Sequence, residues 1–198
     1  MASSPLSLIR RPDAPLPEDE AISLIAKTDR ERAFNLLVRK YRDRIYYHGL
    51  YICKDSEEAF DVAQDVFVRA YHEPRLFDEG FRTKAWLFRV CTNRCYNIVR
   101  DKNRRRGILE RLGKASEGLR ESHQAINTVL DKELEKGMGQ ALQELSSDHQ
   151  NILMLRYYHD LSYDEIAETL QVKLGTVMSR LSRAKVKLQE VLGEEPSP

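Results

Sequence analysis

The sequence of 198 residues predicts an all-α protein of two small helical bundles joined by a flexible linker. Glycine is sparse, at nine residues, while Leu, Glu, Arg, Lys and Ala are abundant. That composition is typical of helical proteins. Apolar residues also recur at helical spacing behind capping residues, and the pattern can bury its apolar faces without any strand.

Overall charge and hydropathy narrow the class of protein. The net charge of +1 excludes a uniformly basic chain but allows local basic patches. No segment approaches the 18 apolar residues that a membrane span needs, so we expect no membrane insertion. The N-terminus lacks the charged and apolar regions of a signal peptide, and we therefore expect a cytoplasmic protein.

The first bundle is expected over residues 28–106. Before it, residues 1–17 hold four of the seven prolines and read as a loosely attached tail, followed by a possible short helix over 18–26. Thr28 with Glu31 forms a capping-box pattern, which predicts a long amphipathic helix to about Ile52. Asp55 or Ser56 caps the next helix, which ends before Pro74.

The apolar face of that second helix consists of Ala59, Val62, Ala63, Val66 and Ala70. A third helix is expected over residues 83–103, with a buried stripe that includes Leu87, Cys91 and Ile98. The three helices share one core in a bundle of about 75 residues, which is near the lower limit for an independently stable domain.

The third helix also has the composition of a nucleic-acid contact. Nine basic residues lie between positions 82 and 106, opposed only by Asp101. Aromatic and amide side chains lie among them, and such a mixture suits single-stranded or distorted nucleic acid. The candidate contacts on this face are Lys84, Trp86, Asn93, Arg94, Asn97 and Arg100. Taken singly, Trp86 and Phe88 are more typical of core residues, and a solvated basic end is the alternative interpretation.

Residues 107–137 carry many charges and weak periodicity, so we expect a linker, with a possible helix over 125–136. The second bundle is expected over 138–192, with Ala141, Leu142 and Leu145 facing inward. Ser147, with Gln150 three residues later, is the expected cap of the following helix. Residues 193–198 form a C-terminal tail.

The end of this bundle has a helix-turn-helix pattern. Ser162 and Glu165 form a capping box, residues 171–175 interrupt the periodicity, and a second helix follows. The buried stripe of that helix is Val177, Leu181, Ala184, Leu188 and Val191. Basic residues lie around the stripe, and because the cap, the small Ala167, the turn and the inward Val177 all stand at helix-turn-helix offsets, the helix is expected to enter the DNA major groove. An ordinary amphipathic helix with a solvated basic face is the alternative.

No pattern indicates catalysis or a cofactor. The three cysteines include Cys91 and Cys95, which are spaced to share a helix face, but they continue the apolar stripe and read as core residues. No Cys/His cluster supports a metal site. We also find no nucleophile and base pair and no phosphate-binding loop, so we expect no enzyme activity.

Three motifs resemble conserved regions of the sigma-70 family, in particular its compact extracytoplasmic-function group. They are D-V-A-Q-D-V-F-V-R-A-Y (61–71), A-W-L-F-R-V-C-T-N-R-C-Y-N-I-V-R (85–100), and L-S-Y-D-E-I-A-E-T-L (161–170) with G-T-V-M-S-R-L-S-R-A-K (175–185). The resemblance implies an alternative sigma factor that binds core RNA polymerase, recognises the −10 and −35 promoter elements and promotes DNA melting.

The resemblance also implies roles for individual residues. Asp61, Gln64, Asp65 and Phe67 match positions that dock on the clamp helices of the polymerase β′ subunit, and the β flap is the second expected polymerase contact. Asn93 and Asn97 match the lining of the pocket for a flipped −10 base. The expected −35 contacts are Gly175, Thr176, Met178, Ser179, Arg180 and Arg183. An anti-sigma factor is an expected partner, and the linker resembles the segment that threads the polymerase cleft.

Three positions depart from the family pattern. Gln171 stands where the turn often has Gly, Met178 where Lys is usual, and Thr83 where an aromatic residue often precedes the tryptophan. Two other functions remain open from the residues. A sigma mimic would bind an anti-sigma factor and not DNA, and a one-component regulator would use only the helix-turn-helix and leave the face around Trp86 unused.

Overall fold

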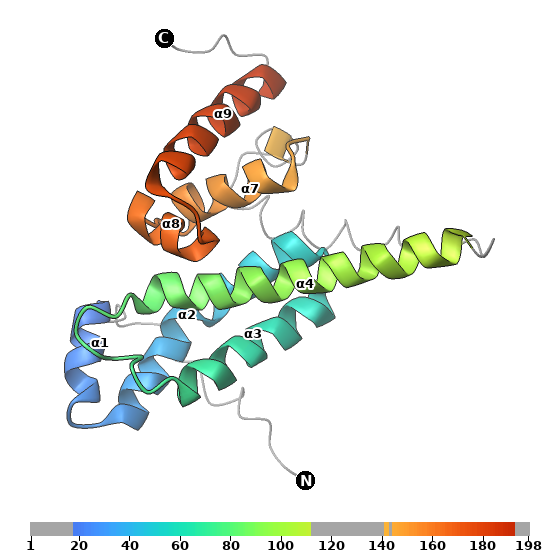
Figure 1. Cartoon of the computed structure of the whole chain (residues 1–198). Helices are drawn as coiled ribbons and strands as arrows, with labels where there is room; N and C mark the ends of the chain where they lie inside the picture. The colour runs from blue at the N-terminus through green and yellow to red at the C-terminus, as the bar shows by residue number, and fades with distance from the viewer. Residues whose placement is uncertain (1–17, 112–140, 143, 193–198) are drawn as a thin grey trace.

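The computed structural model describes residues 18–111, 141, 142 and 144–192, and every regular element within these ranges is helical. The predicted all-α fold class is confirmed. The first half of the chain forms α1 (Asp19–Ala26), α2 (Arg30–Cys53), α3 (Ser56–His72) and α4 (Thr83–Arg111). The second half forms α7 (Ser147–Leu153), the π-helical turn η2 (Met154–Tyr158), α8 (Tyr163–Leu170) and α9 (Leu174–Leu192). Figure 1 shows the second half lying across α4.

The helices α2, α3 and α4 bury the apolar stripes that the sequence predicts. Leu37, Ile45, Val66, Leu87 and Cys91 are among the side chains with almost no exposed surface. The Cys91 thiol donates a hydrogen bond to the backbone oxygen of Ile45 at 3.6 Å. The cysteines of α4 are therefore part of the packing between α2 and α4, as expected for small core residues.

The caps of α2 and α3 decide where these helices begin. The predicted cap at Thr28 is wrong: the Asp29 carboxylate accepts from the Arg32 N–H at 2.9 Å, and the Thr28 hydroxyl donates to the oxygen of Ile25. Both residue types suit this position, and Asp is the stronger cap. Asp55 caps α3 as predicted. The N–H of Glu58, together with that of Glu57, donates to its carboxylate and lowers the Asp55 pKa.

Helix α4 is longer than the sequence predicted. It was expected to end near Asn103 but continues to Arg111, so the expected linker boundary at residue 107 falls inside the helix. Gly107 does not end it, since one glycine costs a helix only about 1 kcal/mol relative to alanine. The rest of the expected linker, with the possible helix over 125–136, lies outside the described residues.

In the second half, Ala141, Leu142 and Leu145 are buried as predicted. The predicted capping box at Ser147 is wrong by one residue, because the Ser146 hydroxyl accepts from the His149 N–H at 3.4 Å. Gln150 instead donates to the backbone oxygen of Leu142 at 2.6 Å, which ties α7 to the preceding segment.

The helix-turn-helix forms as predicted. Ser162 and Glu165 make both bonds of the capping box at the start of α8. Gln171 ends α8 with φ +54°, in the left-handed region that favours glycine, so the turn keeps the usual geometry with an unusual residue. In α9, Val177, Leu181 and Ala184 are buried, and Leu188 and Val191 are half-buried. This is the predicted stripe.

The two halves share one continuous core, which the sequence did not reveal. The rings of His48 in α2, Phe88 in α4 and His159 after η2 pack together, with the Phe88 and His159 centroids 4.3 Å apart. Helix α8 lies along the first turns of α4, and Figure 1 shows it between α4 and α9.

Candidate nucleic-acid interface

One side of α4 presents four of the six predicted contacts to solvent. Asn93, Arg94, Asn97 and Arg100 are all exposed. Positions 93, 97 and 100 are one turn apart and share a helix face. Arg94 lies beside them, and its Nε is 3.3 Å from the Asp65 carboxylate of α3. The structure therefore brings two amides and two guanidinium groups onto one accessible strip.

The other two predicted contacts, Lys84 and Trp86, are not part of this strip. Trp86 is only 9% exposed and packs within the core, with its ring 6.4 Å from that of Phe81. The Lys84 ammonium donates to the backbone oxygen of Asp160 at 2.6 Å, and burial lowers its pKa. The sequence predicts both residues beside the strip, and the fold corrects this: Lys84 bonds the second half of the chain, and Trp86 belongs to the core.

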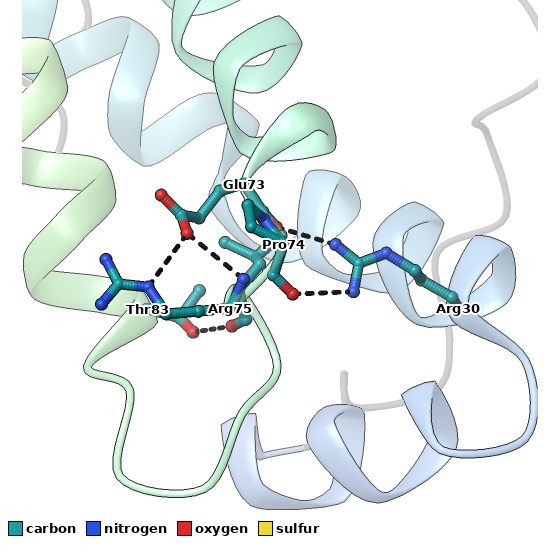
Figure 2. A network of polar contacts seen from close by, with 6 residues as sticks. Arg30, Glu73, Pro74, Arg75 and Thr83 are labelled. Carbon is teal, nitrogen blue, oxygen red and sulfur yellow. Dashed lines mark hydrogen bonds and ion pairs between the residues drawn. The ribbon is translucent and has the colours of Figure 1, made fainter.

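The connection between α3 and α4 is held by polar bonds, as Figure 2 shows. The Arg30 guanidinium donates to the backbone oxygen of Glu73 at 2.8 Å and to that of Pro74 at 3.4 Å. The Glu73 carboxylate accepts from the backbone N–H and the Nε of Arg75. The Thr83 hydroxyl donates to the oxygen of Leu76. These contacts fix where α4 begins and thus how its exposed strip is oriented.

The first turns of α9 form the second candidate surface. Gly175, Met178, Ser179 and Arg183 are exposed, and Thr176 and Arg180, which flank the buried stripe, are half-buried. The Ser179 hydroxyl donates to the oxygen of Thr176, and the Arg183 Nε donates to the oxygen of Ser179. All six predicted residues therefore lie at one end of one helix, as a major-groove contact requires.

A third surface lies on α3. Asp61 and Gln64 are exposed, and Asp65 and Phe67 are half-buried. Asp65 forms ion pairs with Arg69 and Arg94, so its charge is already partly compensated. A hollow of about 500 Å³ beside Asp61 is lined by Tyr46, Ser56, Glu57, Phe60 and Asp61.

Three large exposed side chains on α3 lie outside the set of predicted docking residues. Phe60, Val68 and Tyr71 are 41%, 58% and 58% exposed. Phe60, Phe67 and Tyr71 follow one another at spacings of seven and four, which places them on one side of the helix. That spacing was visible in the sequence as a second apolar stripe, beside the buried one. Exposed apolar stripes of this kind are typical of docking surfaces.

Within the described ranges, none of the helices combines the length and the apolar character that crossing a bilayer would require.

Comparison with known proteins agrees with this arrangement. Residues 37–105 match the family described as Sigma-70 region 2, and residues 137–188 match Sigma-70, region 4. The RNA polymerase sigma-H factor of Pseudomonas aeruginosa is 32% identical over 187 residues, which cover 89% of this chain and 96% of that protein. The ECF RNA polymerase sigma factor SigW of Bacillus subtilis is 30% identical over 178 residues, covering 86% and 94%.

Two solved structures are similar in fold. The sigma factor RpoE of Bartonella quintana, in complex with the anti-sigma factor NepR, has a TM-score of 0.63 and 26% identity and covers 83% of this chain and 99% of its own. CnrH in complex with the cytosolic domain of CnrY has a TM-score of 0.61 and 22% identity, with 88% and 97% covered.

Proposed function

We propose that the two halves of this chain read two promoter elements, because the chain belongs to the extracytoplasmic-function group of the sigma-70 family. Members of that group are alternative sigma factors for transcription initiation with RNA polymerase. The second half binds intact duplex at the −35 element, and the first half binds an opened strand at the −10 element. The observation that carries this proposal is the presence of two exposed polar helix surfaces, on α4 and α9, in one chain.

At the −35 element, the first turns of α9 lie in the major groove. Met178 and Ser179 are exposed there, and Arg180 and Arg183 add positive charge within the same turns. Arginine reads guanine edges by two parallel hydrogen bonds and also binds phosphate, so these residues combine sequence reading with affinity. Met178 contributes an apolar contact, such as one to a thymine methyl group.

At the −10 element, the strip of Asn93, Arg94, Asn97 and Arg100 binds a strand whose bases have left the stack. An extruded base exposes its pairing edge, and amides one turn apart can donate to it and accept from it. The arginines follow the phosphates of the same strand. Binding to the opened strand and not to the duplex is what promotes melting, since it offsets the free energy of unstacking.

The exposed stripe on α3 docks on the clamp helices of the polymerase. Phe60, Phe67 and Tyr71 supply apolar contact area, and Asp61 with Gln64 supplies polar contacts at its edge. The second half is proposed to contact the β flap. Docking at both places raises the effective concentration of each DNA-reading surface at its element, so that two weak contacts give one specific complex.

The proposed action involves no covalent chemistry by this chain, which therefore acts as a binding subunit and not as an enzyme. We also propose that an anti-sigma factor binds it. This proposal is supported by the structural relatives, one of which was solved with the anti-sigma factor NepR and the other with the cytosolic domain of CnrY.

Run-off transcription tests the proposal. Bacterial core RNA polymerase is incubated with a promoter library, with and without the chain, and the new start sites are sequenced. We expect start sites that require the chain and share two sequence blocks at a fixed separation. A chain that core polymerase does not capture and that produces no new start sites would refute the proposal. Start sites that share only one block would favour a one-component regulator.

A further inference from the structure

Arg69 on α3 is not among the predicted DNA or polymerase contacts, yet it lies next to one of them. It is exposed in the last turn of the helix. Its Nη2 atom is 3.1 Å from Oδ2 of Asp65, one turn earlier on α3. The same oxygen lies 3.3 Å from Nε of Arg94 on α4. A single carboxylate oxygen therefore holds two guanidinium groups together where α3 and α4 meet.

The shared oxygen is buried, although the two bases are not. Oδ2 of Asp65 has almost no solvent-accessible surface, whereas the side chains of Arg69 and Arg94 are 54% and 48% exposed. Both contacts are ion pairs without hydrogen-bond geometry, so the N–H donors of both guanidinium groups remain available to a ligand. Because the carboxylate already restrains two flexible side chains, binding a ligand costs them less conformational entropy.

The charges and spacing of this cluster suit a phosphate group. Two guanidinium groups against one carboxylate leave an excess of positive charge, which a bound anion would balance. The two nitrogens that flank Oδ2 are separated by roughly 6 Å at most, so both groups can donate to the oxygens of one phosphate at N–H···O distances of about 2.9 Å. Arginine binds phosphate in this forked geometry better than lysine does.

The cluster borders the exposed strip of α4. Helices α3 and α4 pack side by side, as Figure 1 shows, and Arg94 follows Asn93 directly in the strip. A strand whose bases reach Asn93 and Asn97 therefore has its backbone within reach of Arg94. Arg69 brings a second positive charge to the same place from α3. The positive edge of the strip thus extends over two helices.

We propose that Arg69 and Arg94, held by Asp65, clamp one backbone phosphate of the opened strand. This inference rests on the proposed function, to which it adds a phosphate site on α3. Asp65 is then a positioning residue for the clamp and not a polymerase contact, because its inner oxygen is out of reach of a partner. Asp61, one turn earlier and exposed, keeps the docking role that the family resemblance implies.

Binding of a labelled single strand measures the clamp. The full chain is titrated at low salt against a fluorescent oligonucleotide of about twenty thymidines, followed by anisotropy, since a phosphate clamp requires no base sequence. Arg69→Ala and Arg94→Ala are each expected to weaken binding about tenfold. The double variant should bind about as weakly as either single one, because both lose the same phosphate. Arg39→Ala, exposed on α2, makes the same charge change and should bind like the wild type.

Two carboxylate variants test the positioning role. Asp65→Asn and Asp61→Asn remove the same charge one turn apart on α3. We expect Asp65→Asn to weaken strand binding and to leave capture by core polymerase unchanged, and Asp61→Asn to do the reverse. Tighter strand binding by Asp65→Asn would mean that the carboxylate competes with phosphate for the arginines, and would overturn the clamp.

Other outcomes would overturn it as well. They are a wild-type chain that does not bind the strand, additive losses from Arg69→Ala and Arg94→Ala, and equal losses on the matching duplex. Thermal melting checks that each variant folds, and Arg69→Gln, which keeps most of the side-chain length, replaces Arg69→Ala if that variant melts early. Run-off transcription tests the proposed function separately. Transcription with additive strand-binding losses would sink only the clamp, whereas an intact clamp without transcription would sink only the function.

Discussion

Acid is expected to destabilise this protein through one buried pair of histidines. His48 and His159 have no exposed surface, and their rings lie 5.0 Å apart between the two halves. His48 Nε2 lies 2.9 Å from the Thr92 hydroxyl, while its Nδ1 and both nitrogens of His159 have no hydrogen-bond partner within the described part of the chain. Burial lowers the pKa of His48 to about 3.

The pKa of His159 is lowered still further, first by burial and then by the charges of its neighbours His48, Arg44 and Lys84. In the unfolded chain a histidine has a pKa of about 6.5. Between pH 6.5 and the folded pKa, the unfolded state therefore binds more protons, and stability falls as the pH falls. From pH 7.5 to 5.5 each histidine should remove about 1.4 kcal/mol from the free energy of unfolding, and the pair about 3 kcal/mol.

Urea unfolding at pH 7.5 and 5.5, followed by circular dichroism, measures this loss. His159→Phe removes one titrating ring at nearly constant volume and is expected to lose about half as much stability over the same interval. His72→Gln, on the exposed last turn of α3, controls for the loss of a histidine as such. Equal losses in wild type and His159→Phe would show that the buried pair does not govern acid stability.

Three further substitutions test the proposed surfaces. Arg180→Ala should weaken binding to −35 duplex by about 1–3 kcal/mol in gel-shift titration with polymerase. Lys187→Ala, farther along α9, is the control and should have little effect. Equal binding by the two variants would contradict the major-groove contact. Asn97→Ala should reduce permanganate reactivity of the −10 region more than it reduces duplex binding, and Asn103→Ala on the same helix is its control. Tyr71→Ser should lower capture by core polymerase without changing the melting temperature by more than a few degrees, and unchanged capture would exclude this part of α3 from the interface.

Features set by neighbouring residues were largely predictable from the sequence. The Ser162 and Glu165 capping box and the stripe of α9 need only local chemistry and helical spacing, and both formed as expected. The misplaced caps show the limit of local reasoning. Thr28 and Asp29 are adjacent and can both cap, and which of them does so depends on the backbone conformation at the helix start.

The position of Lys84 could not be predicted in the same way. Its residue type suits nucleic acid, but its ammonium donates to the backbone oxygen of Asp160, across a contact between residues more than 70 positions apart. No periodicity in either segment indicates that contact. The residues of α9, by contrast, keep the predicted arrangement because a helix-turn-helix orients its second helix from within a few turns of sequence.

The π-helical turn η2 determines the register between the two halves. The His159 N–H bonds the oxygen of Met154, five residues back, and Asp160 follows with φ +52°. A π-helical turn closes its hydrogen bond over one residue more than an α-helical turn does. Deleting that residue would rotate everything after it by about 100°, turning the ring of His159 and the carbonyl of Asp160 away from α4. A single amino acid of chain length thus decides whether the second half meets the first along its apolar side or along a polar one.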